Sequence, residues 1–130
     1  MWGGSVWAIT LWTRNREPRL VAGTANPGTA RALVIADWRE LGREAPGLVV
    51  GDFAVLPDRL RALVYLAGGN PEDTLAGALS SFLTRSTTHV GLRGIALWDP
   101  RMECARIESP LELAVWQQRI RSTRQVAATR

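Results

Sequence analysis

Alternating apolar positions predict three β-strands in the first half of the chain. The stretch 5–12 (SVWAITLW) is apolar at both odd and even positions, which is typical of a strand covered on two sides. The stretch 48–56 is predicted to be a second strand, and 59–66 a third, in which Leu60, Ala62, Val64 and Leu66 alternate with Arg59, Arg61, Leu63 and Tyr65. Only Pro57 and Asp58 separate these two, so we expect an antiparallel β-hairpin.

Apolar spacing changes to a helical period in two further segments. The first helix is predicted over 30–43, where the apolar positions Val34, Trp38 and Leu41 fall at i, i+4 and i+7. A second helix is predicted to begin at Asn70, a good N-cap, with Pro71 at the first helical position. Its apolar stripe (Leu75, Leu79, Phe82, Leu83) fades around residues 89–94.

The last third of the chain predicts a fourth extended region and a third helix. Residues 95–98 and 102–107 read as short extended pieces on either side of Asp99-Pro100. The sequence 109–112 (SPLE) is a capping box with Pro at the first helical position, so a helix begins there. We expect residues 122–130 to be frayed.

The element order β-α-β-β-α-β-α indicates the fold class. We expect an α+β, ferredoxin-like antiparallel sheet (βαββαβ) with an added C-terminal helix. A chain of 130 residues suits one core, so residues 1–125 are predicted to form a single domain and 126–130 a frayed tail. Such a fold hosts many activities and does not define one.

Charge and composition narrow the function classes. The net charge is +4, and all 16 basic residues are arginine, a bias typical of a GC-rich genome that is also compatible with nucleic-acid binding. No apolar run is long enough for a membrane span, and Met1 to Gly4 is not a signal-peptide start, so we expect a cytoplasmic protein. A single cysteine, Cys104, and a single histidine, His89, exclude an internal disulfide and a multi-histidine metal site.

Four segments, in the right order, resemble one protein family. Residues 51–66 (GDFAVLPDRLRALVYL) resemble the hallmark "EFVVMPNHVHLLI" of the single-tyrosine HUH transposases, in their REP-associated or insertion-sequence-type branch. Residues 6–19 resemble the opening "fFVTICTKNREP" of that family. Residues 75–88 take the place of its helix "LSSIIRGFKSxxTRR", and 97–113 resemble "VWQRNYYEHIIRNEEEL". The resemblance covers residues 5 to 121.

This resemblance implies a dimeric protein that recognises hairpins in single-stranded DNA. The family cuts DNA with a tyrosine nucleophile and forms a 5′-phosphotyrosine bond. A divalent metal, Mg²⁺ or Mn²⁺, polarises the scissile phosphate and is held by two histidines of a His-hydrophobe-His strand. Residues i and i+2 of a strand share one face, so two imidazoles converge on one ion.

The chain departs from this pattern at the residues that carry the chemistry. Asp58 stands where the family has Asn, and Arg59 and Arg61 stand where it has the two histidines. A guanidinium is always protonated and has no lone pair to give, so it cannot ligate a metal. We therefore expect neither metal-binding nor catalytic residues here, no cofactor, and loss of the phosphotyrosine cleavage that the resemblance implies.

The family's tyrosine position is expected at about Arg85 in the second predicted helix. Residues 84–88 contain no tyrosine, and the chain's single tyrosine, Tyr65, is on the third predicted strand. The resemblance also implies a third metal ligand, a polar side chain from the helix that carries the tyrosine. His89, four residues past Arg85, is near that position, but one histidine does not make a metal site. The alternative interpretation is that His89 is an ordinary histidine at the end of a helix.

Three arginines at the positions of the implied active site suggest another function for that site. Arg59 and Arg61 share one face of their strand, and Arg85 is expected to approach them, so together they would bind a phosphate without a metal. The other interpretation is that they are solvated arginines paired with acids such as Asp52 or Asp58.

Trp12 is the tryptophan expected to be exposed. It lies at a strand end beside Arg14 and Arg16, where a base would stack on its ring. Packing, at a dimer interface for example, is the alternative interpretation.

Three functional hypotheses follow. The first is a catalytically degenerate, transposase-like domain that binds single-stranded or hairpin DNA through Arg59, Arg61, Arg85, Arg14, Arg16 and Trp12. The second is a homodimeric scaffold or protein-interaction module without nucleic-acid binding. The third is a residually active DNA transposase with a rewired site.

Overall fold

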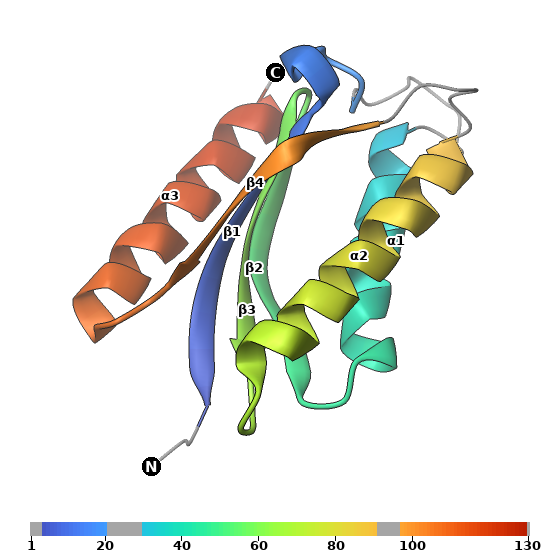
Figure 1. The fold of residues 1–130 in the computed structure, drawn as a ribbon. Coiled ribbons are helices and arrows are strands. Elements are labelled where there is room, and N and C mark those ends of the chain that lie inside the picture. Colours follow the sequence, from blue (N-terminus) through green and yellow to red (C-terminus); the bar gives the residue numbers. More distant parts are fainter. Residues whose placement is uncertain (1–3, 21–29, 91–96, 130) are drawn as a thin grey trace.

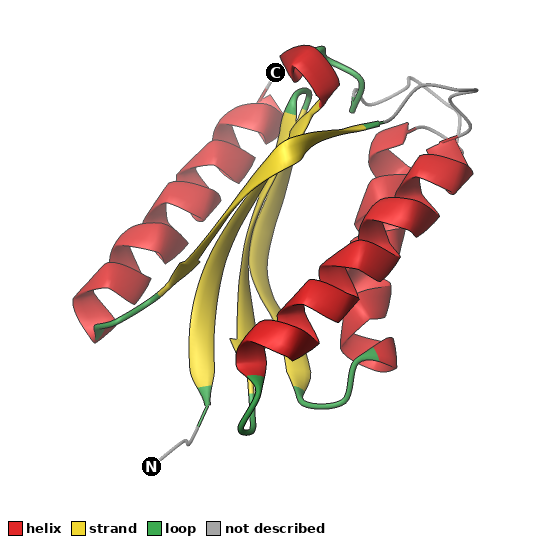
Figure 2. Ribbon diagram, viewed as in Figure 1, coloured by secondary structure: helices red, strands yellow, loops and turns green. Residues whose placement is uncertain are grey.

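A four-stranded antiparallel sheet forms the centre of the protein, with the strand order β2-β3-β1-β4 (Figures 1 and 2). The computed structural model describes residues 4–20, 30–90 and 97–129, with side chains as far as Thr123. The strands are β1 (Ser5–Thr13), β2 (Leu48–Leu56), β3 (Arg59–Leu66) and β4 (Trp98–Arg106). The helices are α1 (Ala30–Glu44), α2 (Pro71–Val90) and α3 (Pro110–Thr129), and a short 3-10 turn, η1, spans Arg14–Arg16. This is the ferredoxin-like α+β fold with a C-terminal helix that the element order predicts.

The helices lie on both faces of the sheet. Figure 1 shows α1 and α2 side by side on one face and α3 alone on the other. The helices on the two faces therefore pack against separate cores.

None of the helices in the described ranges has the length and apolar character needed to cross a bilayer.

The α1/α2 face carries the main core. Trp38 of α1 and Phe82 of α2 are fully buried and meet edge to face, with ring centroids 5.0 Å apart. Leu60 and Val64 of β3 point into the same cluster and are also fully buried. Trp98 adds its ring next to Phe82, and its indole N–H donates to the buried Ser86 hydroxyl at 2.8 Å.

The α3 face carries a smaller core. Ile120 of α3 is fully buried against Leu63 of β3 and two small strand residues, Ala8 and Ala54. Trp116, Leu113 and Ile107 pack at the margin of this cluster. The alanines let α3 lie close to the sheet, but they provide little apolar surface.

The β2–β3 turn is held by hydrogen bonds from two other segments. The Thr13 N–H donates to the Asp58 carbonyl and the Leu20 N–H donates to the Pro57 carbonyl, both at 2.9 Å. The Thr13 hydroxyl also contacts the Asp58 carbonyl at 3.2 Å. The pairing of β2 with β3 confirms the predicted β-hairpin.

Strand β4 is continuous across Asp99-Pro100, where the sequence predicts two pieces. Proline lacks the N–H that a central strand needs, but β4 is an edge strand and its pairing with β1 shifts register between Leu11 and Thr13. An edge strand with such an irregularity tolerates Pro100. Residues 95 and 96 of the predicted extended piece lie outside the described residues.

Helix α3 begins at the predicted cap. The Glu112 N–H donates to the Ser109 hydroxyl at 3.1 Å, and the Glu112 carboxylate accepts the Glu108 N–H at 3.1 Å. The backbone is helical as far as Thr129, so the helix includes most of the segment expected to be frayed.

Candidate nucleic-acid interface

Arg59 and Arg61 lie together on the α3 face of the sheet. Their strand neighbours Leu60 and Ala62 point to the other face, into the main core. In the register of the sheet, Arg59 lies opposite Trp12 of β1. We call Arg59 and Arg61 the β3 arginine pair. The shared face predicted from the sequence is confirmed.

Arg59 is paired with the acid that precedes it. Its Nε and Nη2 atoms donate to the two carboxylate oxygens of Asp58 at 3.0 and 3.1 Å. This bond lowers the pKa of Asp58, with a smaller contribution in the same direction from the charge of Arg16. The same bond raises the pKa of Arg59. Part of the charge of Arg59 is therefore neutralised, as the solvated-arginine interpretation expects.

Arg61 differs from Arg59 in its hydrogen-bond partners. The residue is half-buried, and its Nε atom is buried without a hydrogen-bond partner in the part of the chain that the structure describes. It lies between Thr10 of β1 and Ala54 of β2 in the register, and neither supplies a negative charge. No ion pair joins Arg61 to an acid in the described ranges, so its guanidinium charge is available to an anionic ligand.

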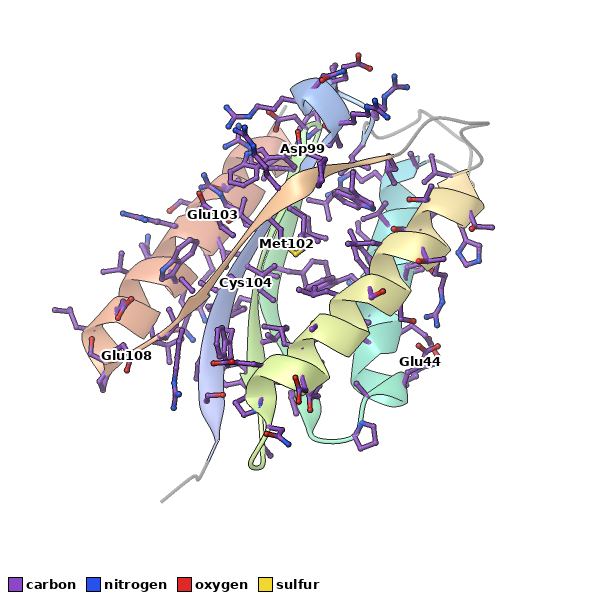
Figure 3. All side chains as sticks on the ribbon, viewed as in Figure 1. Glu44, Asp99, Met102, Glu103, Cys104 and Glu108 are labelled. Atoms are coloured by element: carbon purple, nitrogen blue, oxygen red, sulfur yellow. The ribbon has the colours of Figure 1, made fainter. Side chains whose placement is uncertain are left out.

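Trp12 and Arg16 form a groove beside the β3 arginine pair. The Arg16 guanidinium lies over the Trp12 ring, 5.4 Å from its centroid. The groove has a volume of about 560 Å³ and is lined by Trp12, Arg16, Asp99, Pro100, Arg101, Met102 and Glu103. We call it the Trp12 groove. Figure 3 shows its β4 wall, with Asp99 and Glu103 along the strand.

The Trp12 groove contains groups that the sequence analysis did not identify. Glu103 pairs with Thr10 in the register of β1 and β4, so it shares the face of Arg61. Sequence spacing does not reveal this, because β1 and β4 are more than eighty residues apart in the chain. Arg14 is exposed in η1 and is not among the groove residues.

Arg85 does not approach the β3 arginine pair, and this part of the expected site is wrong. It belongs to α2, which packs on the opposite face of the sheet. Its Nη2 lies 2.5 Å from the Glu44 carboxylate of α1, and this contact raises the pKa of Arg85. Figure 3 shows Glu44 on the far side of the molecule from Glu103. The sequence places Arg85 on a helix but does not indicate which face that helix covers.

His89 also lies on the opposite face. Its Nδ1 is 2.9 Å from the buried carboxylate of Asp37, so the pair joins α2 to α1. This geometry suits the interpretation of His89 as a helix-end histidine, and it leaves His89 far from the β3 arginine pair.

The helix that does cover the face of the β3 arginine pair is α3. Arg121 of α3 bridges to Asp52 of β2 at 3.2 Å, and Arg119 lies over the Trp116 ring at 5.7 Å. The sequence of α3 contains no tyrosine. Any nucleophile brought to Arg61 by a helix would therefore be a residue type other than tyrosine.

Tyr65 shares the face of Arg61 but is distant from it. Four residues along a strand correspond to roughly 13 Å, whereas a reacting nucleophile must come within roughly 3–3.5 Å of its target. The Tyr65 ring also packs tightly over Gly51, where an added Cβ would lie 2.6 Å from its Cε2 atom. Its position thus fits packing on the sheet.

The side chains at this site do not fit a divalent metal. The two arginines offer no lone pair, and Asp58 already accepts both bonds from Arg59. Across the described ranges, no three His, Cys, Asp or Glu side chains are grouped so that they could hold an ion. The residues instead bring arginines and carboxylates together beside an aromatic ring.

Comparison with solved structures places the fold. No established family and no curated protein matches the chain by sequence. A REP-associated tyrosine transposase, solved with a bound REP hairpin, matches with a TM-score of 0.72 at 20% identity over 92% of this chain. A transposase candidate from Deinococcus radiodurans R1 matches with a TM-score of 0.63 at 19% identity, over 92% of this chain and 90% of its own.

The chain shares the fold of these two proteins. It spans 66% of the length of the REP-associated transposase. At this level of identity the likeness establishes the fold, and the function must be argued from the site.

Proposed function

We propose that this chain is a transposase-like domain that binds structured single-stranded DNA without cleaving it. The observation that carries the proposal is the arrangement of Arg61, Arg59, Arg16 and Trp12 at one end of the α3 face. Arginine forks suit phosphate oxygens, and an aromatic ring gives a base a surface to stack on.

The roles divide among these residues. Arg61 contacts a backbone phosphate, because no acid in the described part of the chain forms an ion pair with its guanidinium. Arg59 contributes a weaker contact, because Asp58 holds its guanidinium. A base enters the Trp12 groove and displaces or stacks beside Arg16. The related fold solved with a REP hairpin supports a DNA hairpin as the ligand.

Two features support binding without cleavage. The β3 arginine pair replaces the metal-binding histidines that the resemblance implies, and α3, the helix on that face, contains no tyrosine. A phosphate held between guanidinium groups therefore has neither a Lewis acid nor a placed nucleophile.

Fluorescence anisotropy with a labelled single strand that carries a hairpin tests the proposal. Wild type and an Arg59→Ala/Arg61→Ala double variant are titrated at low and moderate salt. For single strands the salt slope changes by roughly 0.7 for each phosphate contact, so the double variant should lower its magnitude by about 0.7 to 1.4, depending on how far Arg59 leaves Asp58. Arg85→Ala is the matched control, because Arg85 lies on the opposite face.

The outcomes separate the three hypotheses. Salt-sensitive binding that the double variant weakens and Arg85→Ala does not supports the proposal. No binding by a folded protein at low salt would favour the scaffold hypothesis. A covalent protein–DNA adduct formed with Mg²⁺ or Mn²⁺ would contradict the loss of cleavage. Homodimerisation stays a prediction, which light scattering of the purified chain would test.

A further inference from the structure

A small cavity lies at the outer edge of β2, away from the Trp12 groove. Its lining comes from three elements: Arg31, Ile35 and Arg39 of α1, Phe53, Ala54 and Val55 of β2, and Thr123 of α3. Its volume is about 130 Å³. Pockets for drug-sized ligands begin at roughly 300 Å³, so this β2-edge cavity suits a single small group.

The helical period of α1 brings both arginines to this cavity. Arg31, Ile35 and Arg39 are spaced by four residues and lie on one side of the helix. The Arg39 guanidinium lies over the Phe53 ring, 5.7 Å from its centroid. This cation–π contact holds the exposed Arg39 side chain beside the cavity.

The charges around the β2-edge cavity are not balanced. Neither Arg31 nor Arg39 has an ion-pair partner within the described ranges, and the nearby acids Asp37 and Glu40 of α1 pair with His89 and Arg43. The first turn of α1 also lacks an acidic residue, so the positive end of the helix dipole adds to the charge of Arg31. Two guanidinium groups that share a cavity repel each other unless an anion lies between them.

We propose that the β2-edge cavity is a phosphate-binding site. Arg31 and Arg39 donate charge-assisted hydrogen bonds to the phosphate oxygens, and the Thr123 hydroxyl supplies a further donor. Phe53 and Val55 form an apolar wall that excludes water and strengthens these bonds.

This site is separate from the proposed DNA-binding face but adjacent to it. Ala54 lines the β2-edge cavity and is the register partner of Arg61. The phosphate can thus be a free ion or the backbone of a strand that crosses the edge of β2. The chemistry is the same, and the experiment distinguishes the two sources.

NMR titration of the full chain, following the arginine Nε–H signals, tests the proposal. The probes are inorganic phosphate and a short single-stranded oligonucleotide. Arg39→Gln should weaken binding at this site by about tenfold, the effect of losing one charge-assisted hydrogen-bonding group. Arg43→Gln is the control, because it removes the same charge from α1 at a residue whose side chain is 83% exposed and outside the cavity.

A second variant, Thr123→Val, should also weaken binding while keeping the shape of the side chain. Saturation by inorganic phosphate would support a site for the free ion, and a response to the oligonucleotide alone would support a backbone site. Equal binding by the Arg39→Gln and Arg43→Gln variants would overturn the proposal, as would Arg39 signals that neither probe moves.

The two proposals fail independently. The Arg59→Ala/Arg61→Ala variant should lose binding to the DNA hairpin and keep the response of Arg39 to inorganic phosphate. If that variant loses both, the β2-edge cavity has no binding of its own and the inference is wrong.

Discussion

The two faces of the sheet carry side chains of different size and charge. The α1/α2 face is filled by large side chains such as Trp38 and Phe82, which are fully buried. The α3 face has alanines under its helix and arginines beside it. Stability is therefore concentrated on one face, and the other is available for contacts with ligands. Substitutions at the β3 arginine pair can therefore occur without disturbing the main core.

Truncation of Phe82 should have the largest effect and would test the first half of this comparison. Phe82→Ala removes a ring that contacts both Trp38 and Trp98. We expect it to lower the free energy of unfolding by about 3–5 kcal/mol, measured by urea denaturation. Leu111→Ala is the control, because that side chain is 76% exposed and should cost under about 0.5 kcal/mol.

Truncation of Ile120 would test the other half. Ile120→Ala removes the fully buried anchor of α3, and we expect a loss of about 2 kcal/mol, near the lower end for such truncations, because the cluster around it is small. If Ile120→Ala destabilises the protein as much as Phe82→Ala, the two faces share the stability equally and the comparison fails.

Substitution of the N-cap residue of α3 would show how much the cap contributes to the stability of this helix. Ser109→Ala removes the acceptor of the Glu112 N–H and should lower the free energy of unfolding by about 1 kcal/mol. Ser109→Asp keeps an acceptor oxygen and should restore most of the loss. A Ser109→Ala variant as stable as wild type would mean that sheet contacts alone hold α3.

Asp58 gives the smallest change in stability and a change in binding. Asp58→Asn breaks the pair with Arg59, in which both side chains are partly exposed, so the loss of stability should be at most about 1 kcal/mol. Because the full charge of Arg59 is released, we expect tighter binding of the DNA hairpin in the anisotropy assay. Asp52→Asn removes the same charge from the same face but pairs with Arg121, so it should have a smaller effect on binding.

The Asp58–Arg59 pair also predicts a pH dependence. The pKa of Asp58 is lowered in the folded protein, so its contribution to stability is complete above the unfolded pKa of about 3.9. The contribution is lost as the pH falls through the lower folded value. Wild type and Asp58→Asn should therefore differ near pH 5 and converge under more acidic conditions, which acid titration of the unfolding free energy would show.

The sequence predicts the strands and helices well because each has a local signal. Periodicity of two or of 3.6, the Pro57-Asp58 turn and the Ser109 N-cap are local features that the structure contains, and α2 begins at Pro71, next to the predicted cap Asn70. The position of Arg59 and Arg61 on one face follows from strand alternation alone. The prediction of two pieces in place of β4 was wrong, because an edge strand tolerates Pro100 and the edge position is a property of the whole sheet.

The position of a helix relative to a face could not be predicted from local signals. Arg85 lies on α2 and Trp12 on β1, and only the packing decides which of them meets the β3 arginine pair. The register that sets Trp12 opposite Arg59 joins residues 47 positions apart in the chain. The unpartnered Nε of Arg61 likewise depends on what every other element leaves uncovered.

The tight turn between β2 and β3 restricts how this protein can evolve. Residues of β3 alternate between the main core and the arginine face, so a one-residue insertion at Pro57-Asp58 would exchange Leu60 and Ala62 for their arginine neighbours. Such a change would expose the core and bury two cations at once. We therefore expect homologues of this domain to change activity by substitutions on β3, with a constant number of residues between the two strands. Insertions and deletions should occur elsewhere in the chain.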